Sequence, residues 1–508
     1  MGYIHKKVLS MGKFGRFWLK NQARILLILL FIVTVAVFAR PYLDTDFGWH
    51  HRNGQILLTQ GRFVRADEFS WTMTGYERAY NWPTEAVFYL LESWNLYWVL
   101  TILFALISAI ALFLVIQSTA DCRSFWPKVF AIIFGAILLV SFVGVRTQVV
   151  SILFFSALWV IFWRRFFQKR VSLVLVPFLF VLWANFHYAF FLGLVFLLFF
   201  SLIEGGKFLG QKLKLWPSWL DQKRLKKEDL LRLAAITIFS FGSVFLTPYG
   251  ILTYQTVLKD FSSNYLKQNI VEWVPVTITS EIGLLFFIYV VITVIFLATS
   301  WKKVTFSIFC LWFVTLVLAL SSVRNIPLFT VASTPFLVNF WPKFSRQFPL
   351  QSFWVDLFGP AYLVLFAVIL LAFQAANIFK TGVSDQELAR KSSFDYPVEA
   401  VKFLKTHPQE GKVFNSYKWG GYLIWQLPEV KTFIDGRMPG WRENKINPFA
   451  DYLTITKVEN NTLKLLDQWN ISWTLTEKDL PLTILLANTT SWEKVYEDSV
   501  AVIFKRNK

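Results

Sequence analysis

Residues 44–52 read DTDFGWHHR and place two carboxylates, two imidazoles and one guanidinium within nine positions. Carboxylates and imidazoles bind divalent cations, and oxygen-rich ligand sets favour Mg²⁺ or Mn²⁺. Asp44 and Asp46 are therefore candidates for catalysis, and Asp46 also for metal binding. The side chains of His50 and His51 point apart because they are neighbours in sequence, so at most one faces a metal, and we take His50 as that candidate. The alternative is a solvated surface loop.

Four later turns of the chain carry polar groups of the same kind. Arginine binds phosphate through its planar fork of N–H donors. Charged groups at membrane depth are costly and face a cavity or each other, so we interpret Arg52, Arg146 and Arg324 as phosphate ligands. Solvated loops are the alternative, and Asn185 and His187 could simply cap a helical hairpin. The groups in these turns are Arg146 and Gln148, Asn185 and His187, Glu272 and Glu281, and Arg324 and Asn325.

The elements that must position these groups are apolar runs of membrane-spanning type. Of 508 residues, 55% are hydrophobic, with 54 Phe and 23 Trp, and runs of about 15–23 apolar residues recur. This composition predicts a polytopic α-helical membrane protein of about eleven spans. The expected spans are 24–40, 96–117, 128–144, 148–163, 171–185, 188–203, 232–247, 282–300, 304–321, 326–340 and 356–378.

The net charge of +19 is distributed in a way that indicates membrane topology and not nucleic-acid binding. The segments 1–24, 164–170, 204–232, 301–303 and 341–346 hold 22 Lys and Arg against four acids. Basic residues concentrate in cytoplasmic loops, so we expect these segments inside. An odd number of spans then places the C-terminus outside, in a multi-pass protein of the plasma membrane.

Two large polar segments are expected on the outer side. The loop 41–95 carries seven acids and four arginines and belongs to a membrane domain that covers residues 1–379. The tail 380–508 alternates helical and strand patterns, with strands expected at KVFNSY, KTFIDGR, SWTLTE and AVIFKR. We therefore predict a soluble α/β domain over 380–508.

The stretch DTDFGWHHR resembles the acidic motif of GT-C fold glycosyltransferases. Its spacing is similar to that of oligosaccharyltransferase catalytic subunits, in which an acid-x-Asp pair is followed six residues later by Arg, here Asp44, Asp46 and Arg52. The resemblance implies that Asp46 binds a catalytic divalent metal and that Asp44 supports it. The family also has an outer-loop Glu that binds the metal or contacts the acceptor, and Glu272 and Glu281 are the candidates.

A second resemblance lies in the tail. SYKWGGYLIWQLPEVKTFIDGR is similar to the segment around the Trp-Trp-Asp-Tyr-Gly acceptor motif of the same enzymes, although Lys418 replaces the Asp and Gly420 the Tyr. It implies that Trp419, Tyr422, Asp435 and Arg437 help to hold an acceptor; a WGGYLIW core helix and an Asp435–Arg437 pair are the alternatives. The whole pattern also resembles a broad group of uncharacterised bacterial membrane proteins.

These resemblances imply an inverting glycosyltransferase. Its donor would be a sugar or oligosaccharide on a polyprenyl phosphate, held among the spans, and its acceptor a glycan, lipid or protein outside the cytoplasm. A transporter or flippase of lipid-linked sugars and a non-catalytic cell-envelope assembly protein are the alternatives. Polar groups at the outer ends of the spans, without repeated halves, favour the enzyme.

Overall fold

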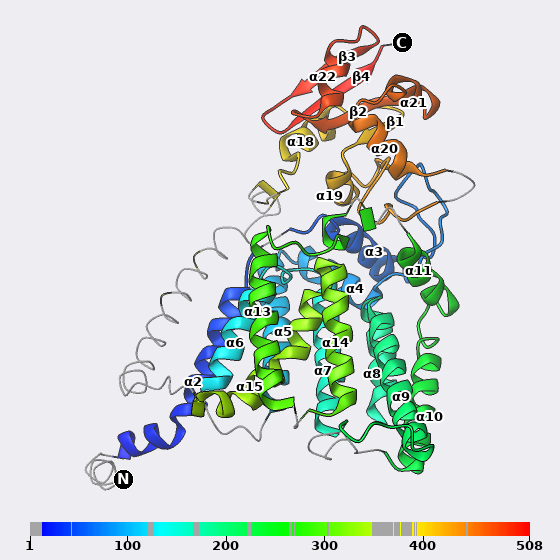
Figure 1. The fold of residues 1–508 in the computed structure, drawn as a ribbon. Helices are drawn as coiled ribbons and strands as arrows, with labels where there is room; N and C mark the ends of the chain where they lie inside the picture. The colour runs from blue at the N-terminus through cyan, green and yellow to red at the C-terminus, as the bar shows by residue number, and fades with distance from the viewer. Residues whose placement is uncertain are drawn as a thin grey trace.

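The computed structural model shows a bundle of apolar helices with a smaller mixed domain above it (Figure 1). The structure describes residues 13–347 apart from 42, 120–125, 166–171, 221–224, 264–266, 269 and 302–303. It then describes 369, 376, 389–390, 392, 394–442 and 446–507. All statements of absence below refer to these residues.

In the described part of the chain the bundle consists of ten helices, and each overlaps a predicted apolar run. Pairs packed against one another include α5 with α7, α6 with α15, α13 with α15 and α8 with α10. The helices are α2 (Lys13–Phe38), α5 (Tyr97–Gln117), α6 (Trp126–Leu139), α7 (Gln148–Trp163), α8 (Leu175–Phe186), α9 (Phe190–Lys212), α10 (Lys227–Ser243), α13 (Glu281–Ser300), α14 (Phe306–Ser321) and α15 (Ile326–Gln347).

Three of these helices, α5, α9 and α13, are long and apolar enough to cross a membrane. Five further apolar segments are 10–17 residues long, within α2, α6, α7, α8 and α14. The helical, membrane-compatible character of the bundle thus agrees with the sequence, whereas the count of eleven spans is not shown. The predicted span 356–378 lies almost entirely outside the described residues, and the orientation across a membrane stays a prediction.

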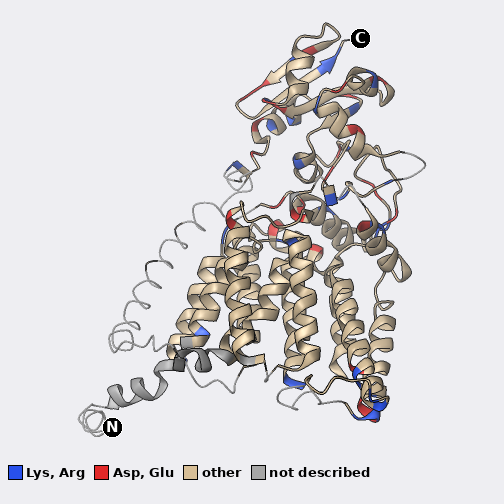
Figure 2. Ribbon diagram, viewed as in Figure 1, with Lys and Arg blue, Asp and Glu red and all other residues tan. Residues whose placement is uncertain are grey.

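Shorter helices cover the end of the bundle that faces the tail. They are α3 (Phe47–Gln60), α4 (Trp82–Ser93), α11 (Ile251–Ser262) and the 3-10 turns η2 (Val271–Trp273) and η4 (Val323–Asn325). Basic residues gather at the opposite ends of α9 and α10, while acidic groups occur at the covered end (Figure 2). The candidate site residues of the bundle therefore share one end of it.

The tail contains a four-stranded sheet of order β1-β2-β4-β3. β1 (Lys412–Asn415) pairs parallel with β2 (Ile471–Glu477), while β4 (Ala501–Arg506) pairs antiparallel with β2 and with β3 (Trp492–Glu497). β1, β2 and β4 were expected from the sequence; β3 was not. The helices of the tail are α18 (Val398–Thr406), η5 (Tyr417–Trp419), α19 (Gly420–Gln426), α20 (Pro448–Thr456), α21 (Thr462–Gln468) and α22 (Pro481–Ala487).

The segment KTFIDGR is not a strand of this sheet, so that expectation is wrong. Its backbone is instead held by the outer loop and by one side chain of β1. The amide of Thr432 donates to the carbonyl of Phe69, and the amide of Trp71 donates to the carbonyl of Thr432. The side chain of Asn415 bonds the amide of Phe433 and the carbonyl of Ile434. These partners satisfy the backbone groups that a sheet would otherwise pair.

The outer loop is built into the tail. Met73 and Tyr76 belong to the same apolar core as Phe414 and Phe433 of the tail. The indole of Trp71 also donates to the carbonyl of Val413. Residues 71–76 of the outer loop therefore pack on the tail, while α4 of the same loop packs on α5 and α8, so the loop ties the tail to the bundle.

Candidate functional site

The two motifs singled out in the sequence lie in direct contact, although about 370 residues separate them. Helix α3 packs on α19, and their backbones approach closely at two glycines. A methyl group on Gly48 would lie 1.8 Å from the carbonyl oxygen of Gly421. A methyl group on Gly421 would lie 2.0 Å from the carbonyl oxygen of Thr45. Both glycines are thus required by the docking of DTDFGW on WGGY.

A third glycine sets the position of Asp46. A methyl group on Gly436, in the segment IDGR, would lie 1.9 Å from Oδ1 of Asp46. The Asp46 carboxylate also accepts a hydrogen bond from the indole of Trp49 at 3.1 Å, and its backbone amide donates to Oδ1 of Asp44 at 2.9 Å. Two segments of the chain, residues 44–49 and the IDGR turn, therefore fix Asp46 at the start of α3.

A polar cavity of about 450 Å³ lies at this contact, between the bundle, the outer loop and the tail. It has the size of a small-molecule site. Its charged lining residues are Asp44, Asp46, Arg78, Arg146, Asp260, Glu272, Arg324, Lys418 and Arg437, and Tyr188, Trp273 and Tyr417 also line it.

Most charged groups of the cavity wall are paired. Arg146 forms ion pairs with both Asp44 and Glu272. Arg78 pairs with Asp260 at 3.0 Å. Lys418 pairs with Glu477 at 2.8 Å. The charges of these groups are therefore largely balanced before any ligand binds.

Asp46 is an exception, because it has no ion-pair partner within the described parts of the chain. Burial, and after it the nearby charges of Asp44, Asp435 and Glu272, together raise the pKa of its carboxyl to about 7. A carboxyl with a pKa near neutrality accepts a proton well at physiological pH. Asp46 is thus suited to general-base catalysis.

Arg324 is the second exception. Its guanidinium donates to the hydroxyl of Tyr188 at 2.6 Å and lies 5.2 Å from the ring centre of Trp273. Within the described residues it forms no ion pair; burial lowers the pKa of its guanidinium, but Tyr188, Glu272 and Asp46 outweigh burial and raise that pKa. A cation held by aromatic groups and lacking a counter-ion is suited to bind an anion.

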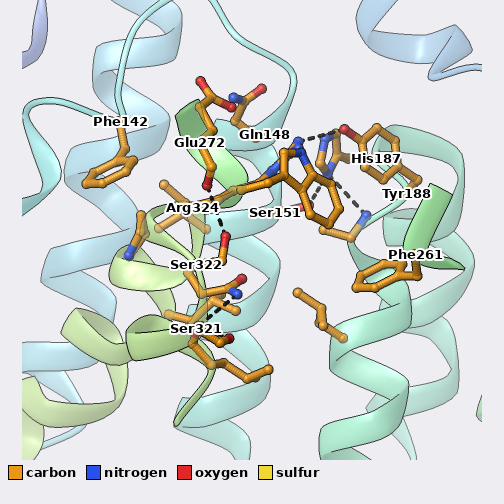
Figure 3. A pocket seen from close by; sticks show the side chains of 18 of the residues that line it. Phe142, Gln148, Ser151, His187, Tyr188, Phe261, Glu272, Ser321, Ser322 and Arg324 are labelled. Carbon is orange, nitrogen blue, oxygen red and sulfur yellow. Dashed lines mark hydrogen bonds between the residues drawn. The ribbon is translucent and has the colours of Figure 1, made fainter. Parts of the chain in front are cut away.

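A second cavity, of about 430 Å³, adjoins the polar one and is mainly apolar. In Figure 3, Phe142 and Phe261 flank it, and Arg324, Glu272 and Gln148 lie towards one end. Five residues line both cavities and form a shared wall: Gln148, Tyr188, Glu272, Trp273 and Arg324. An elongated ligand could occupy both cavities, with its apolar tail in the apolar cavity and its polar head beside Arg324.

Next to the polar cavity, and sharing Arg437 with its lining, lies a buried cluster that we call the clamp, formed by Asp67, Asp435 and Arg437. Arg437 donates to both oxygens of Asp435 at 2.7 Å and pairs with Asp67 at 2.8 Å. All three side chains have an exposed fraction of 0%. The alternative considered from the sequence, that Asp435 and Arg437 pair with each other, describes this geometry. Arg437 also lines the polar cavity, and the acceptor contact expected for this pair stays a prediction.

Several expected site residues lie away from the cavity. Arg52 lies on another face of α3 than Asp46, because six residues along a helix correspond to a rotation of about 600°. Its side chain bonds Gln55 there. Glu281 begins α13 as an exposed residue and lines neither cavity. Trp419 and Tyr422 are buried in the core beneath α19, which fits the core-helix alternative.

The metal expected at Asp46, His50, Glu272 and Glu281 is not matched by a ready ligand set. Nδ1 of His50 bonds Glu85 at 2.9 Å, and the carboxylate of Glu272 bonds Arg146 at 3.1 Å. Within the described residues no three His, Cys, Asp or Glu side chains are grouped to hold a metal ion. The residues as placed do not fit the ion, so no chemical step below is routed through one.

Some residues of the site were missed from sequence. Tyr188 and Trp273, which hold Arg324, directly follow the candidate residues His187 and Glu272, and an aromatic next to a polar turn residue was the available signal. Arg78 and Asp260 carried no signal, because neither stands in a motif. Comparison of the sequence with known proteins gives no matching family and no matching curated protein.

Proposed function

We propose that the protein is an integral membrane glycosyltransferase that uses a sugar donor linked to a polyprenyl phosphate. The observation that carries this proposal is the shared wall between the two cavities. The polar cavity contains Asp46, the apolar cavity adjoins it, and Arg324 lies between them; neither residue has an ion-pair partner within the described residues. A lipid-linked sugar phosphate has the matching order of groups, with an apolar chain, an anionic phosphate and a polar sugar.

The apolar cavity would take the first isoprene units of the donor, and Arg324 the phosphate. Tyr188 and Trp273 hold this guanidinium in place, so little reorganisation is needed as charge develops on the leaving phosphate. The sugar would then occupy the polar cavity, next to Asp46.

In the transfer step, an acceptor hydroxyl attacks the anomeric carbon and its proton passes to the carboxylate of Asp46. A bond forms between the acceptor oxygen and the anomeric carbon, and the bond from that carbon to the phosphate oxygen breaks. The polyprenyl phosphate departs with the electron pair beside Arg324. One direct displacement inverts the configuration of the anomeric carbon.

The test is sugar transfer by purified full-length protein in lipid nanodiscs. Polyprenyl-phosphate-linked sugars are supplied as donors, nucleotide sugars as controls, and membrane glycans as acceptors. The wild type should transfer sugar only from the lipid-linked donors. Asp46→Asn should lose at least about 100-fold in rate, because removing a general base costs about 10²–10⁴.

The matched control is Glu493→Gln, which removes a carboxylate from an exposed position of β3 far from the cavity. It should transfer at the wild-type rate. Wild-type transfer by Asp46→Asn would contradict the enzyme. Donor binding without any transfer by the wild type would instead favour a transporter of lipid-linked sugars.

A further inference from the structure

His187 lies at the turn between α8 and α9, in the wall of the apolar cavity. Its exposed fraction is 1%, and its ring lies 4.2 Å from the ring of Tyr188, which in turn bonds Arg324. Figure 3 shows His187 and Tyr188 side by side at this wall. The proposed reaction gives His187 no role so far.

The hydrogen bonds of His187 assign its protonation state. The backbone amide of Ala189 donates to Nδ1 at 3.2 Å. The indole of Trp183 donates to the hydroxyl of Ser151 at 2.7 Å, and this hydroxyl lies 2.7 Å from Nδ1, to which it can donate its own hydrogen. An amide or indole N–H can only donate, so Nδ1 is an acceptor without a proton. The ring is therefore neutral, with its proton on Nε2.

This proton has no partner in the described protein, since Nε2 is buried without a hydrogen bond. Leaving a buried donor unsatisfied costs about 1–3 kcal/mol. The capping of the α8–α9 turn uses only Nδ1, so the turn itself does not require an N–H at the ε position. A bound ligand with an acceptor atom would satisfy the donor.

We propose that the Nε2–H of His187 donates a hydrogen bond to a phosphate oxygen of the lipid-linked donor, beside Arg324. The inference rests on the proposed function for the identity of this lipid, and it deepens that function by naming a second phosphate ligand. A neutral donor adds binding and direction without adding a second positive charge. His187 thus helps to select a phosphorylated isoprenoid over the free alcohol.

The test measures binding of farnesyl phosphate and of farnesol to the full-length protein in detergent. His187→Asn places an amide oxygen near the position of Nδ1, which keeps the cap on Ala189, and removes the donor at the ε position. His187→Gln places an amide N–H near the position of Nε2. Farnesyl phosphate should bind His187→Asn at least about tenfold more weakly, because a hydrogen bond to a charged group is lost. His187→Gln should recover most of the affinity.

Farnesol affinity and the unfolding temperature should be unchanged in His187→Asn. Wild-type affinity of that variant for farnesyl phosphate would overturn the inference. An equal loss for farnesol would also overturn it, because that result indicates a role in packing alone. Asp46→Asn should still bind farnesyl phosphate with wild-type affinity. The binding measurement therefore tests the role of His187 separately from sugar transfer.

Discussion

The clamp and the cavity wall both consist of charged groups at the junction of bundle and tail, yet they differ in how these charges are balanced. In the clamp, Arg437 is held by Asp67 and Asp435, and no side chain of the three is exposed. In the cavity, Asp46 and Arg324 line the same space, and each lacks an ion-pair partner in the described chain.

The difference separates a structural role from a functional one. A buried charge with its partners in place is costly to disturb, because removing one partner leaves the other charge uncompensated. A charge without a partner is costly to keep, and its cost falls when a ligand of opposite charge or a proton arrives. On this reasoning the clamp holds the tail on the outer loop, and Asp46 and Arg324 serve the reaction.

The largest expected effect comes from breaking the clamp. Arg437→Met leaves two buried carboxylates without a cation, and removing one partner of a buried ion pair costs about 3–5 kcal/mol. The free energy of unfolding should fall by that amount, as measured by denaturant titration of the protein in detergent. Arg324→Met, the matched change in the cavity, should leave this free energy unchanged within about 1 kcal/mol. An equal loss of unfolding free energy in both variants would contradict the distinction between a structural clamp and a functional cavity.

A smaller effect is expected from pH. The pKa of Asp46 is raised to about 7, and only its deprotonated form accepts a proton from the acceptor. The value of kcat/KM should therefore rise about tenfold from pH 6 to pH 8, following the ionised fraction of one group. Glu85, whose pKa burial raises to about 8, titrates in the same range. The rise should persist in Glu85→Gln, and a flat profile in the wild type would exclude Asp46 as the base.

Sequence predicted the residues of the candidate site that belong to recognisable motifs. DTDFGWHHR stood out as a polar cluster after an apolar run, and WGGYLIWQL through its resemblance to an acceptor motif. Arg146, Glu272 and Arg324 stood out as charges near the ends of apolar runs. The placement of Arg52 could not be predicted, because it depends on α3 beginning directly after Asp46 and turning Arg52 away.

Pairing of charges could be predicted only between neighbours in sequence. The Asp435–Arg437 pair was one of the alternatives considered from sequence, but only the folded chain shows that Arg146 pairs with Asp44 and Glu272 and that Asp67 joins Arg437. The strand expected at KTFIDGR failed for a similar reason, since its partners come from residues 69–72, which lie about 360 positions away. β3 was missed because half of Trp492–Glu497 is charged and its apolar residues follow no clear alternation.

The most direct test of the account compares one conservative change in each cluster, Asp46→Asn and Asp435→Asn, by transfer rate and by unfolding at pH 8. The folded-state pKa of Asp46 is raised, so its ionised form reduces stability as pH rises from about 4 to 7, and the asparagine should not lower stability at pH 8. Asp435→Asn turns an amide N–H towards the guanidinium of Arg437 and should lower stability by about 3 kcal/mol.

The account predicts opposite outcomes for the two variants. Asp46→Asn should be folded, at least as stable as the wild type, and at least about 100-fold slower in sugar transfer. Asp435→Asn should be less stable, and the fraction that remains folded should transfer sugar at a rate near that of the wild type. A stable Asp46→Asn protein that transfers sugar at the wild-type rate would contradict the central claim.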